Sequence, residues 1–124
     1  MSNELKRVWE RYVSSWQAGS LPEKLAIFET CLTRDCVYTD PLVTARGWSE
    51  LSRYMLELQQ NVPGVHFVTE QFLAHGAQSA ARWQMLDGRG VKLGEGISYA
   101  EYDASQRLTQ MKGFFELPPS TPAT

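Results

Sequence analysis

Hydrophobic side chains recur at three- and four-residue steps through most of the first 61 residues, which is the spacing of amphipathic helices. The pattern predicts three helices, over about residues 3–19, 20–34 and 48–61. Gly19 is a helix-stop residue, and Ser20 and Glu23 have the spacing of a capping box that starts the second helix. Pro63 and the glycine after it end the third helix and close the helical half of the chain.

The second half of the chain alternates between β-prone runs and turn sequences. The runs predict four strands, over residues 65–73, 79–86, 91–102 and 107–116. Because only short turns separate them, they predict an antiparallel meander. Gly94 and Gly96 lie inside the third strand, where they predict a bulge or bend that curls the sheet.

A shorter β-prone run at residues 36–40 lies between the second and third helices, and residues 41–46 are predicted to form a loop. Helices followed by a curved antiparallel sheet predict an α+β fold. We expect a cone-shaped roll in which the N-terminal helices pack on the sheet and enclose a pocket. A single domain is expected over residues 1–117, and a flexible proline-rich tail over residues 118–124.

Composition narrows the classes of partner. The formal net charge is −2 and no basic run is present, which argues against nucleic acid and anionic membranes as partners. The first residues do not resemble a signal peptide, and nowhere do about 18 apolar residues run together, so we expect a cytoplasmic protein. Cys31 and Cys36 have neither the spacing nor the nearby histidines of a metal site, and are interpreted as buried thiols.

Asp40 is the most informative polar residue, because it ends an apolar run that is expected to face the pocket. A carboxylate in an apolar pocket is costly unless it is compensated, and such groups often serve as acids or bases. However, an aspartate before proline also commonly opens a turn by binding the loop backbone. The residues alone leave both interpretations open.

Five short motifs follow one another along nearly the whole chain. They are Arg11-Tyr12-Val13, Ala18-Gly19, Tyr38-Thr39-Asp40-Pro41, Gly47, and a closing run from Arg107-Leu108 to Met111 and Phe115. In this order they resemble ketosteroid isomerase and the polyketide-cyclase-like (SnoaL-like) proteins of the nuclear-transport-factor-2-like superfamily. The resemblance implies the cone-shaped fold, which hosts isomerases, dehydratases, cyclases, hydrolases and binding modules.

The isomerase resemblance implies roles for individual residues. Asp40 matches the general base that moves a proton between two carbons of an enolisable ketone. Tyr12 matches the tyrosine that donates a hydrogen bond to the developing oxyanion. Ser98 stands where ketosteroid isomerase has a second, protonated acid, so the implied oxyanion hole has an uncharged and weaker donor.

Alternation along the strands predicts the rest of the lining, since Asp40 and the residues on its face point the same way. The expected substrate-binding set is mostly apolar and aromatic. It consists of Trp16, Tyr38, Tyr54, His66, Trp83, Ser98, Ala100, Met111, Gly113 and Phe115. Trp83 fits either the pocket wall or the outer face and is assigned inward, and His66 is either a proton shuttle or a half-buried structural histidine.

Together these features predict a cofactor-independent isomerase, cyclase or dehydratase that binds no metal and acts on an apolar, enolisable small molecule. The alternative is a non-catalytic module that binds an apolar ligand or a protein partner. Aromatic residues in both phases of the late strands exceed what one core requires, so they predict a homodimer through the outer face of the sheet.

Overall fold

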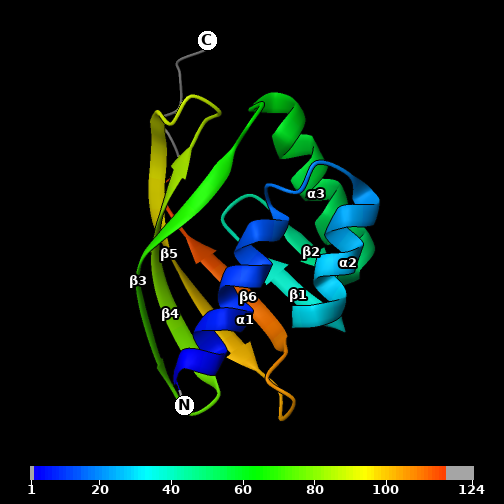
Figure 1. Cartoon of the computed structure of the whole chain (residues 1–124), viewed down its shortest axis with the longest axis vertical. Helices are drawn as coiled ribbons and strands as arrows, with labels where there is room; N and C mark the ends of the chain where they lie inside the picture. Colours follow the sequence, from blue (N-terminus) through cyan, green and yellow to red (C-terminus); the bar gives the residue numbers. More distant parts are fainter. Residues whose placement is uncertain (1, 117–124) are drawn as a thin grey trace.

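The computed structural model describes residues 2–116, so the predicted tail at residues 118–124 lies outside the described part of the chain. Three helices lie on one side of a curved sheet (Figure 1). They are α1 (Ser2–Ser15), α2 (Leu21–Cys31) and α3 (Gly47–Asn61). Within residues 2–116, no helix is long and apolar enough to cross a membrane. This is the expected α+β architecture.

Six strands form one sheet in the order β2-β1-β6-β5-β4-β3. They are β1 (Leu32–Thr39), β2 (Thr44–Arg46), β3 (His66–His75), β4 (Gln78–Leu86), β5 (Lys92–Tyr102) and β6 (Leu108–Phe114). Strands β3 to β6 form the predicted antiparallel meander, whereas β1 pairs with β6 in parallel. The sheet is therefore mixed. No short turn links β1 to β6, so local sequence does not dictate their relative direction.

The main differences from the prediction lie in the first half of the chain. The first helix ends at Ser15, the second ends at Cys31, and a short β2 lies within the predicted loop. Strand β1 already begins at Leu32, and its register on β6 shifts between Leu32 and Val37. This irregularity interrupts the alternation of buried and exposed positions by which a strand is recognised in a sequence.

Bulges bend the long strands, and the curvature is visible in Figure 1. Met85 pairs with Gly94, whereas Leu86 pairs with Lys92, which leaves one extra residue on β5. A second register shift lies between Thr69 and the residues after it on β3. An extra residue on one strand increases the local twist. The bulge predicted near Gly94 and Gly96 is confirmed on β5, where it lies next to Gly94.

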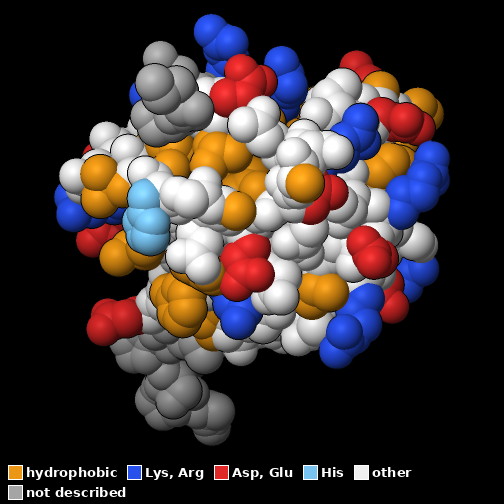
Figure 2. Space-filling view, turned by 90° about the horizontal axis from the view of Figure 1, so that it is seen from below, with side chains coloured by type: hydrophobic (Ala, Val, Ile, Leu, Met, Phe, Trp, Pro, Cys, Tyr) orange, Lys and Arg blue, Asp and Glu red, His pale blue; other side chains and the backbone are white. Residues whose placement is uncertain are grey.

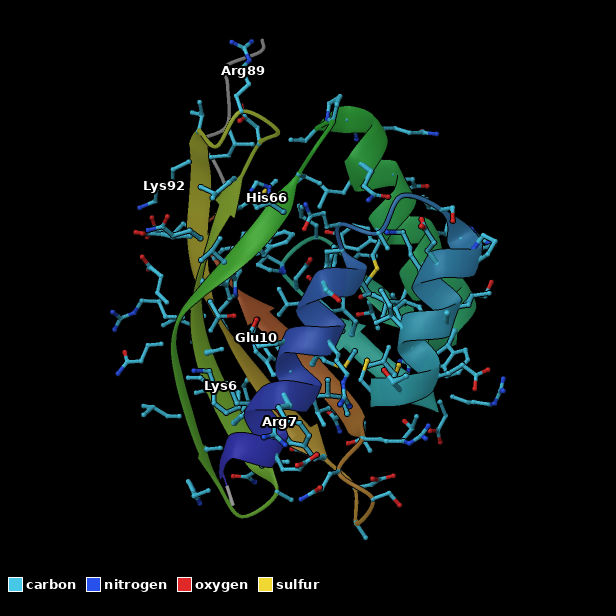
Figure 3. The ribbon with its side chains drawn as sticks, viewed as in Figure 1. Lys6, Arg7, Glu10, His66, Arg89 and Lys92 are labelled. Carbon is cyan, nitrogen blue, oxygen red and sulfur yellow. The ribbon has the colours of Figure 1, made fainter. Side chains whose placement is uncertain are left out.

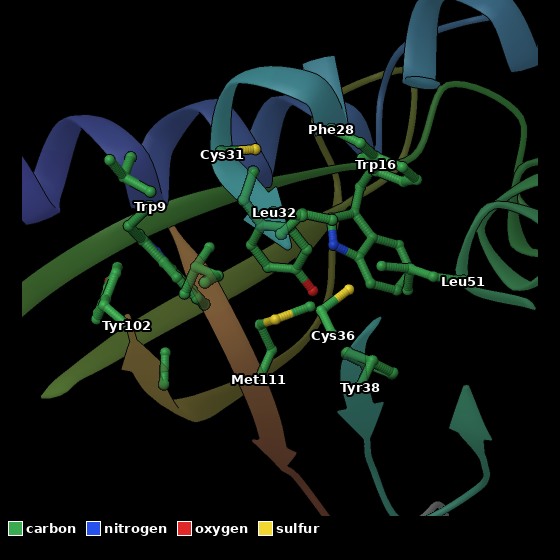
Figure 4. Close-up of a cluster of buried hydrophobic side chains, with 14 of the residues drawn as sticks. Trp9, Trp16, Phe28, Cys31, Leu32, Cys36, Tyr38, Leu51, Tyr102 and Met111 are labelled. Carbon is green, nitrogen blue, oxygen red and sulfur yellow. The ribbon is translucent and has the colours of Figure 1, made fainter. Parts of the chain in front are cut away.

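The hydrophobic core lies between the helices and the inner face of the sheet. Figure 4 shows side chains from α1, α2, β1 and β6 meeting there, among them Phe28, Leu32 and Met111. Cys31 and Cys36 are buried in this cluster as free thiols, as predicted. Burial raises their pKa values to about 12 and about 11, so both stay protonated at neutral pH.

Lys24 is a charged residue inside this core, and 0% of it is exposed. Its Nζ donates to the carbonyl oxygens of Ser15 and Ala18, at 2.8 Å each. The Gln59 side chain on α3 donates to the carbonyls of Trp16 and Ala18, at 3.1 and 2.9 Å. Carbonyls after the last helical turn have no partner within the helix. Lys24 and Gln59 supply these partners, and so join α2 and α3 to the end of α1.

Replacing Lys24 with Met should remove a pH-dependent part of the stability. Burial lowers the pKa of Lys24 to about 8, below that of an unfolded lysine, so between pH 8 and 10.5 the unfolded chain binds more protons. The free energy of unfolding of the wild type should therefore rise relative to Lys24→Met by about 2 kcal/mol between pH 7.5 and 10. Urea denaturation at both pH values measures this change.

The exposed lysine on α1 provides the control, since Lys6→Met should leave the pH dependence unchanged. A stability difference between wild type and Lys24→Met that stays constant across this pH range would contradict the predicted role of the buried ammonium group.

Candidate functional site

Asp40 lies directly after β1 and is only 9% exposed. Its backbone N–H donates to the carbonyl of Val43 at 3.0 Å, which closes a tight turn into β2. Its Oδ1 accepts from the backbone N–H groups of Leu42 and Val43, at 2.7 and 3.1 Å. One carboxylate oxygen therefore shapes the turn, as an aspartate before proline often does.

The other carboxylate oxygen, Oδ2, accepts hydrogen bonds from two phenols. Tyr38 on β1 donates at 2.6 Å, and Tyr54 on α3 donates at 2.8 Å. Burial is the main cause that raises the pKa of both tyrosines, and the negative charge of Asp40 adds to it. Both hydroxyls therefore remain protonated donors at neutral pH. Together with the two backbone groups they compensate the burial of the carboxylate.

Gly113 on β6 faces this cluster. A Cβ placed on Gly113 would lie 3.6 Å from both the Asp40 Cβ and the Tyr38 hydroxyl, and 4.0 Å from the Ser98 Oγ. Ser98 on β5 in turn accepts a hydrogen bond from the Trp83 indole N–H at 2.9 Å. Trp83 therefore shares a face with Ser98, on the side of the sheet that carries Asp40.

Aromatic rings connect this cluster to the core. The Trp16 ring lies 5.4 Å from Tyr38, 5.9 Å from Tyr54 and 5.5 Å from Phe67, measured between centroids. The Trp83 ring lies 5.4 Å from Phe67 and 6.1 Å from Phe115. At these separations the rings are in contact. These side chains occupy part of the region in which the enclosed pocket is predicted.

Tyr12 is buried on α1, where its ring lies 5.2 Å from Trp9 and 6.4 Å from Trp16. Burial raises its pKa well above the ordinary value, so its hydroxyl is a proton donor and not a phenolate. Among the described residues, no hydrogen bond joins Tyr12 to Asp40. The tyrosines that contact the carboxylate are Tyr38 and Tyr54, and the oxyanion role of Tyr12 stays a prediction.

His66 begins β3, and its Nδ1 lies 3.1 Å from the carbonyl oxygen of Gly64 (Figure 3). It makes no hydrogen bond to the Asp40 cluster. Ala100 and Met111 are fully buried register partners on β5 and β6, and Met111 also pairs with Tyr38. They lie on the face of the sheet that carries Asp40, where strand alternation placed them.

Two surface hollows lie away from Asp40. One, of about 550 Å³, follows the outer side of α1, where Figure 3 labels Lys6, Arg7 and Glu10. The other, of about 240 Å³, lies where α1 begins, beside the β3–β4 and β5–β6 turns. Figure 2 views that end of the molecule, where hydrophobic side chains lie among polar ones. The predicted pocket at Asp40 stays a prediction.

The titratable side chains offer little for a metal ion. Within residues 2–116, no three His, Cys, Asp or Glu side chains lie close enough together to hold one. The expectation that the protein works without a metal or an organic cofactor stays a prediction.

A profile of the SnoaL-like domain matches residues 9–111. The chain belongs to the SnoaL-like family. This agrees with the resemblance carried by the short motifs around Tyr12 and Asp40. A search of curated proteins finds no match.

Several solved structures share the fold of this SnoaL-like chain. A candidate isomerase of the family from Agrobacterium tumefaciens has a TM-score of 0.84 at 17% identity, covering 93% of this chain and 99% of its own. A candidate SnoaL-like polyketide cyclase from Jannaschia has a TM-score of 0.76 at 11% identity, covering 93% and 87%. A candidate ketosteroid isomerase from Kribbella flavida has a TM-score of 0.70 at 17% identity, covering 99% and 85%. At such identities the likeness shows a shared fold and not a shared activity.

Sequence reasoning about this SnoaL-like chain missed two features of the site. Tyr38 and Tyr54 were expected to line the pocket, but not to bind the carboxylate. Phe67 was not singled out, although it contacts both Trp16 and Trp83. The spacing of Tyr38 and Asp40 places them on one face of a strand, which was a usable signal. Nothing local connects Tyr54 to either residue, because it comes from a different helix.

Replacing Gly96 with Ala should disturb the wall of the site. A methyl group there would lie 2.5 Å from the Trp83 ring and 2.6 Å from the Phe114 carbonyl oxygen, which requires the backbone or the ring to move. We expect a loss of about 1–3 kcal/mol in the free energy of unfolding. Gly94→Ala is the matched control, because nothing lies within 4 Å of its added methyl group. Equal stability of the two variants in urea denaturation would argue against the close packing of Trp83.

Proposed function

We propose that the protein is a cofactor-independent enzyme that transfers protons on an apolar, enolisable small molecule, in the manner of an isomerase or a polyketide cyclase. The observation that carries this proposal is the buried Asp40 carboxylate with two phenol donors on one oxygen. SnoaL-like family membership supports it, because relatives with this fold are described as candidate isomerases and cyclases.

The proposed chemistry needs a base, a donor to the substrate oxygen and little water. Asp40 would accept the proton from a carbon next to a carbonyl group. The Ser98 hydroxyl already accepts from Trp83, so its own hydrogen is available to the oxygen on which negative charge develops. Tyr12 is proposed to donate a second hydrogen bond to the same substrate oxygen. The surrounding rings favour a planar, apolar substrate.

Asp40→Asn tests the proposal directly. The variant keeps the size of the side chain but cannot act as a base, so kcat should fall at least about 100-fold. Turnover of β,γ-unsaturated ketones and of cyclase substrates by the purified protein is the measurement. Asp35→Asn, an exposed aspartate on β1, should retain full activity. Unchanged turnover in a folded Asp40→Asn protein would show that Asp40 is not the base.

A non-catalytic binding module is the second candidate. It is favoured by the four donors that already bind the carboxylate oxygens of Asp40, and by serine at the position of the second acid. A ligand that raises the melting temperature of wild type, Asp40→Asn and Tyr12→Phe alike, without turnover in any panel, would favour the module over the enzyme.

The protein is further proposed to form a homodimer through the outer face of the sheet. Ser98 points inward, so its neighbour Ile97 points outward, where it pairs with Phe114 on β6. Ile97 is 50% exposed and Phe114 is 58% exposed, and Val68 and Leu73 add further exposed apolar groups on β3. The helices lie on the opposite side of the sheet (Figure 1). A second copy of this face would cover these side chains. The proposed location of the protein is the cytoplasm.

Ile97→Asp should abolish this dimer, because a carboxylate would be buried at the centre of the contact. Sedimentation velocity at micromolar concentration should show a dimer for the wild type and a monomer for the variant. Leu21→Asp, which changes an exposed leucine on α2, should remain dimeric. A monomeric wild type under these conditions rejects the dimer.

A further inference from the structure

The Asp40 carboxylate has no free acceptor position in this structure. A carboxylate offers about four lone-pair directions to donors. Leu42 and Val43 donate their backbone N–H groups to Oδ1, and Tyr38 and Tyr54 donate their hydroxyls to Oδ2. Neither of the described hollows reaches Asp40. A ligand that binds the carboxylate must therefore replace one of these four donors.

The two backbone donors are held in place by the turn itself. Asp40 donates its backbone N–H to the Val43 carbonyl at 3.0 Å, and Val43 donates to the Asp40 carbonyl at 3.3 Å. Moving either amide away from Oδ1 would disrupt this turn between β1 and β2. The exchangeable donor is therefore on Oδ2.

The two tyrosines on Oδ2 differ in how firmly they are held. Tyr38 is 8% exposed and lies within β1, where its backbone pairs with Ala45 on one side and Met111 on the other. Its hydroxyl also lies against Gly113. Tyr54 lies on α3 and is only partly buried, and its hydroxyl makes one hydrogen bond, to Oδ2. The Tyr54 ring also packs against Trp16 and Tyr38, but it is less buried than the Tyr38 ring, so rotating its side chain away would expose less buried surface.

We propose that Tyr54 is the displaceable donor of this site, and that a planar ligand with a phenolic or enolic hydroxyl reaches Asp40 by replacing the Tyr54 hydroxyl on Oδ2. The ligand class follows from the group it replaces, since the phenol of Tyr54 already fills the position. In this structure the Tyr54 hydroxyl therefore competes with such a ligand for Asp40 Oδ2. This inference rests on the proposed function insofar as Asp40 is the group that meets the ligand.

The test uses p-cresol, which is the tyrosine side chain as a free molecule, and 4-methylanisole, which lacks the O–H. Their dissociation constants are measured by NMR titration against the full chain and against Tyr54→Phe and Tyr38→Phe. Tyr54→Phe keeps the ring but removes the competing hydrogen bond, so it should bind p-cresol about tenfold more tightly than the wild type. Its affinity for 4-methylanisole should change less than about twofold.

Tyr38→Phe is the matched control, because it also removes one hydrogen bond from Oδ2 but leaves the freed position against a buried ring. Its affinity for p-cresol should not increase. In the wild type, p-cresol should shift the ring resonances of Tyr54 more than those of Tyr38, whose ring lies 5.8 Å away and senses the change only as a neighbour. Equal tightening in both variants, equal tightening for both ligands, or no p-cresol binding up to 10 mM would each overturn the inference.

These outcomes are separate from those for catalysis. Tight p-cresol binding by Tyr54→Phe, without Asp40-dependent turnover, would support Tyr54 as the displaceable donor and contradict the proposed enzymatic function. Asp40-dependent turnover, with equal p-cresol affinity in Tyr54→Phe and Tyr38→Phe, would support the proposed enzymatic function and contradict Tyr54 as the displaceable donor.

Discussion

The buried carboxylate of Asp40 imposes the constraint on which the rest of the site depends. Without donors its burial would cost several kcal/mol, so the fold must bring hydrogen-bond donors to it from different parts of the chain. They come from β1, from the turn into β2, and from α3. The same four bonds that stabilise the charge therefore also fix the helix and the turn relative to the strand.

A second buried charge positions the aromatic side of the site. Lys24 and Gln59 bind the carbonyls at the end of α1, and this holds the segment that carries Trp16. The Trp16 ring then contacts both tyrosines that donate to Asp40. The two buried charges are thus connected through Trp16. Lys24 holds the segment that carries this tryptophan, and the Trp16 ring packs against the two tyrosines that donate to the carboxylate. These donors are already bonded to Asp40 Oδ2, so they stabilise the charged form of the carboxylate.

The local patterns predicted much of the fold. Amphipathic periodicity gave the third helix and most of the first two, and the turn sequences gave the four strands of the meander. Ser20 caps the second helix as predicted, since the Glu23 backbone N–H donates to its hydroxyl, but the Glu23 carboxylate accepts from the backbone N–H of Gly19 and not from that of Ser20. The errors lie where a distant group decides. Lys24 and Gln59 bind the carbonyls at and just after the end of the first helix, and β1 begins early where β6 supplies its partner.

The sequence by itself determined the α+β class, the face of the strand on which Asp40 lies, and the family to which the chain belongs. These features depend on spacing along the chain, which the period of a helix or a strand converts directly into direction. Only the tertiary structure decided that Tyr38 and Tyr54, and not Tyr12, bind the carboxylate, and that aromatic rings fill the region around it. A hydrogen bond between a strand and a helix depends on how the two pack, and no local spacing encodes that distance.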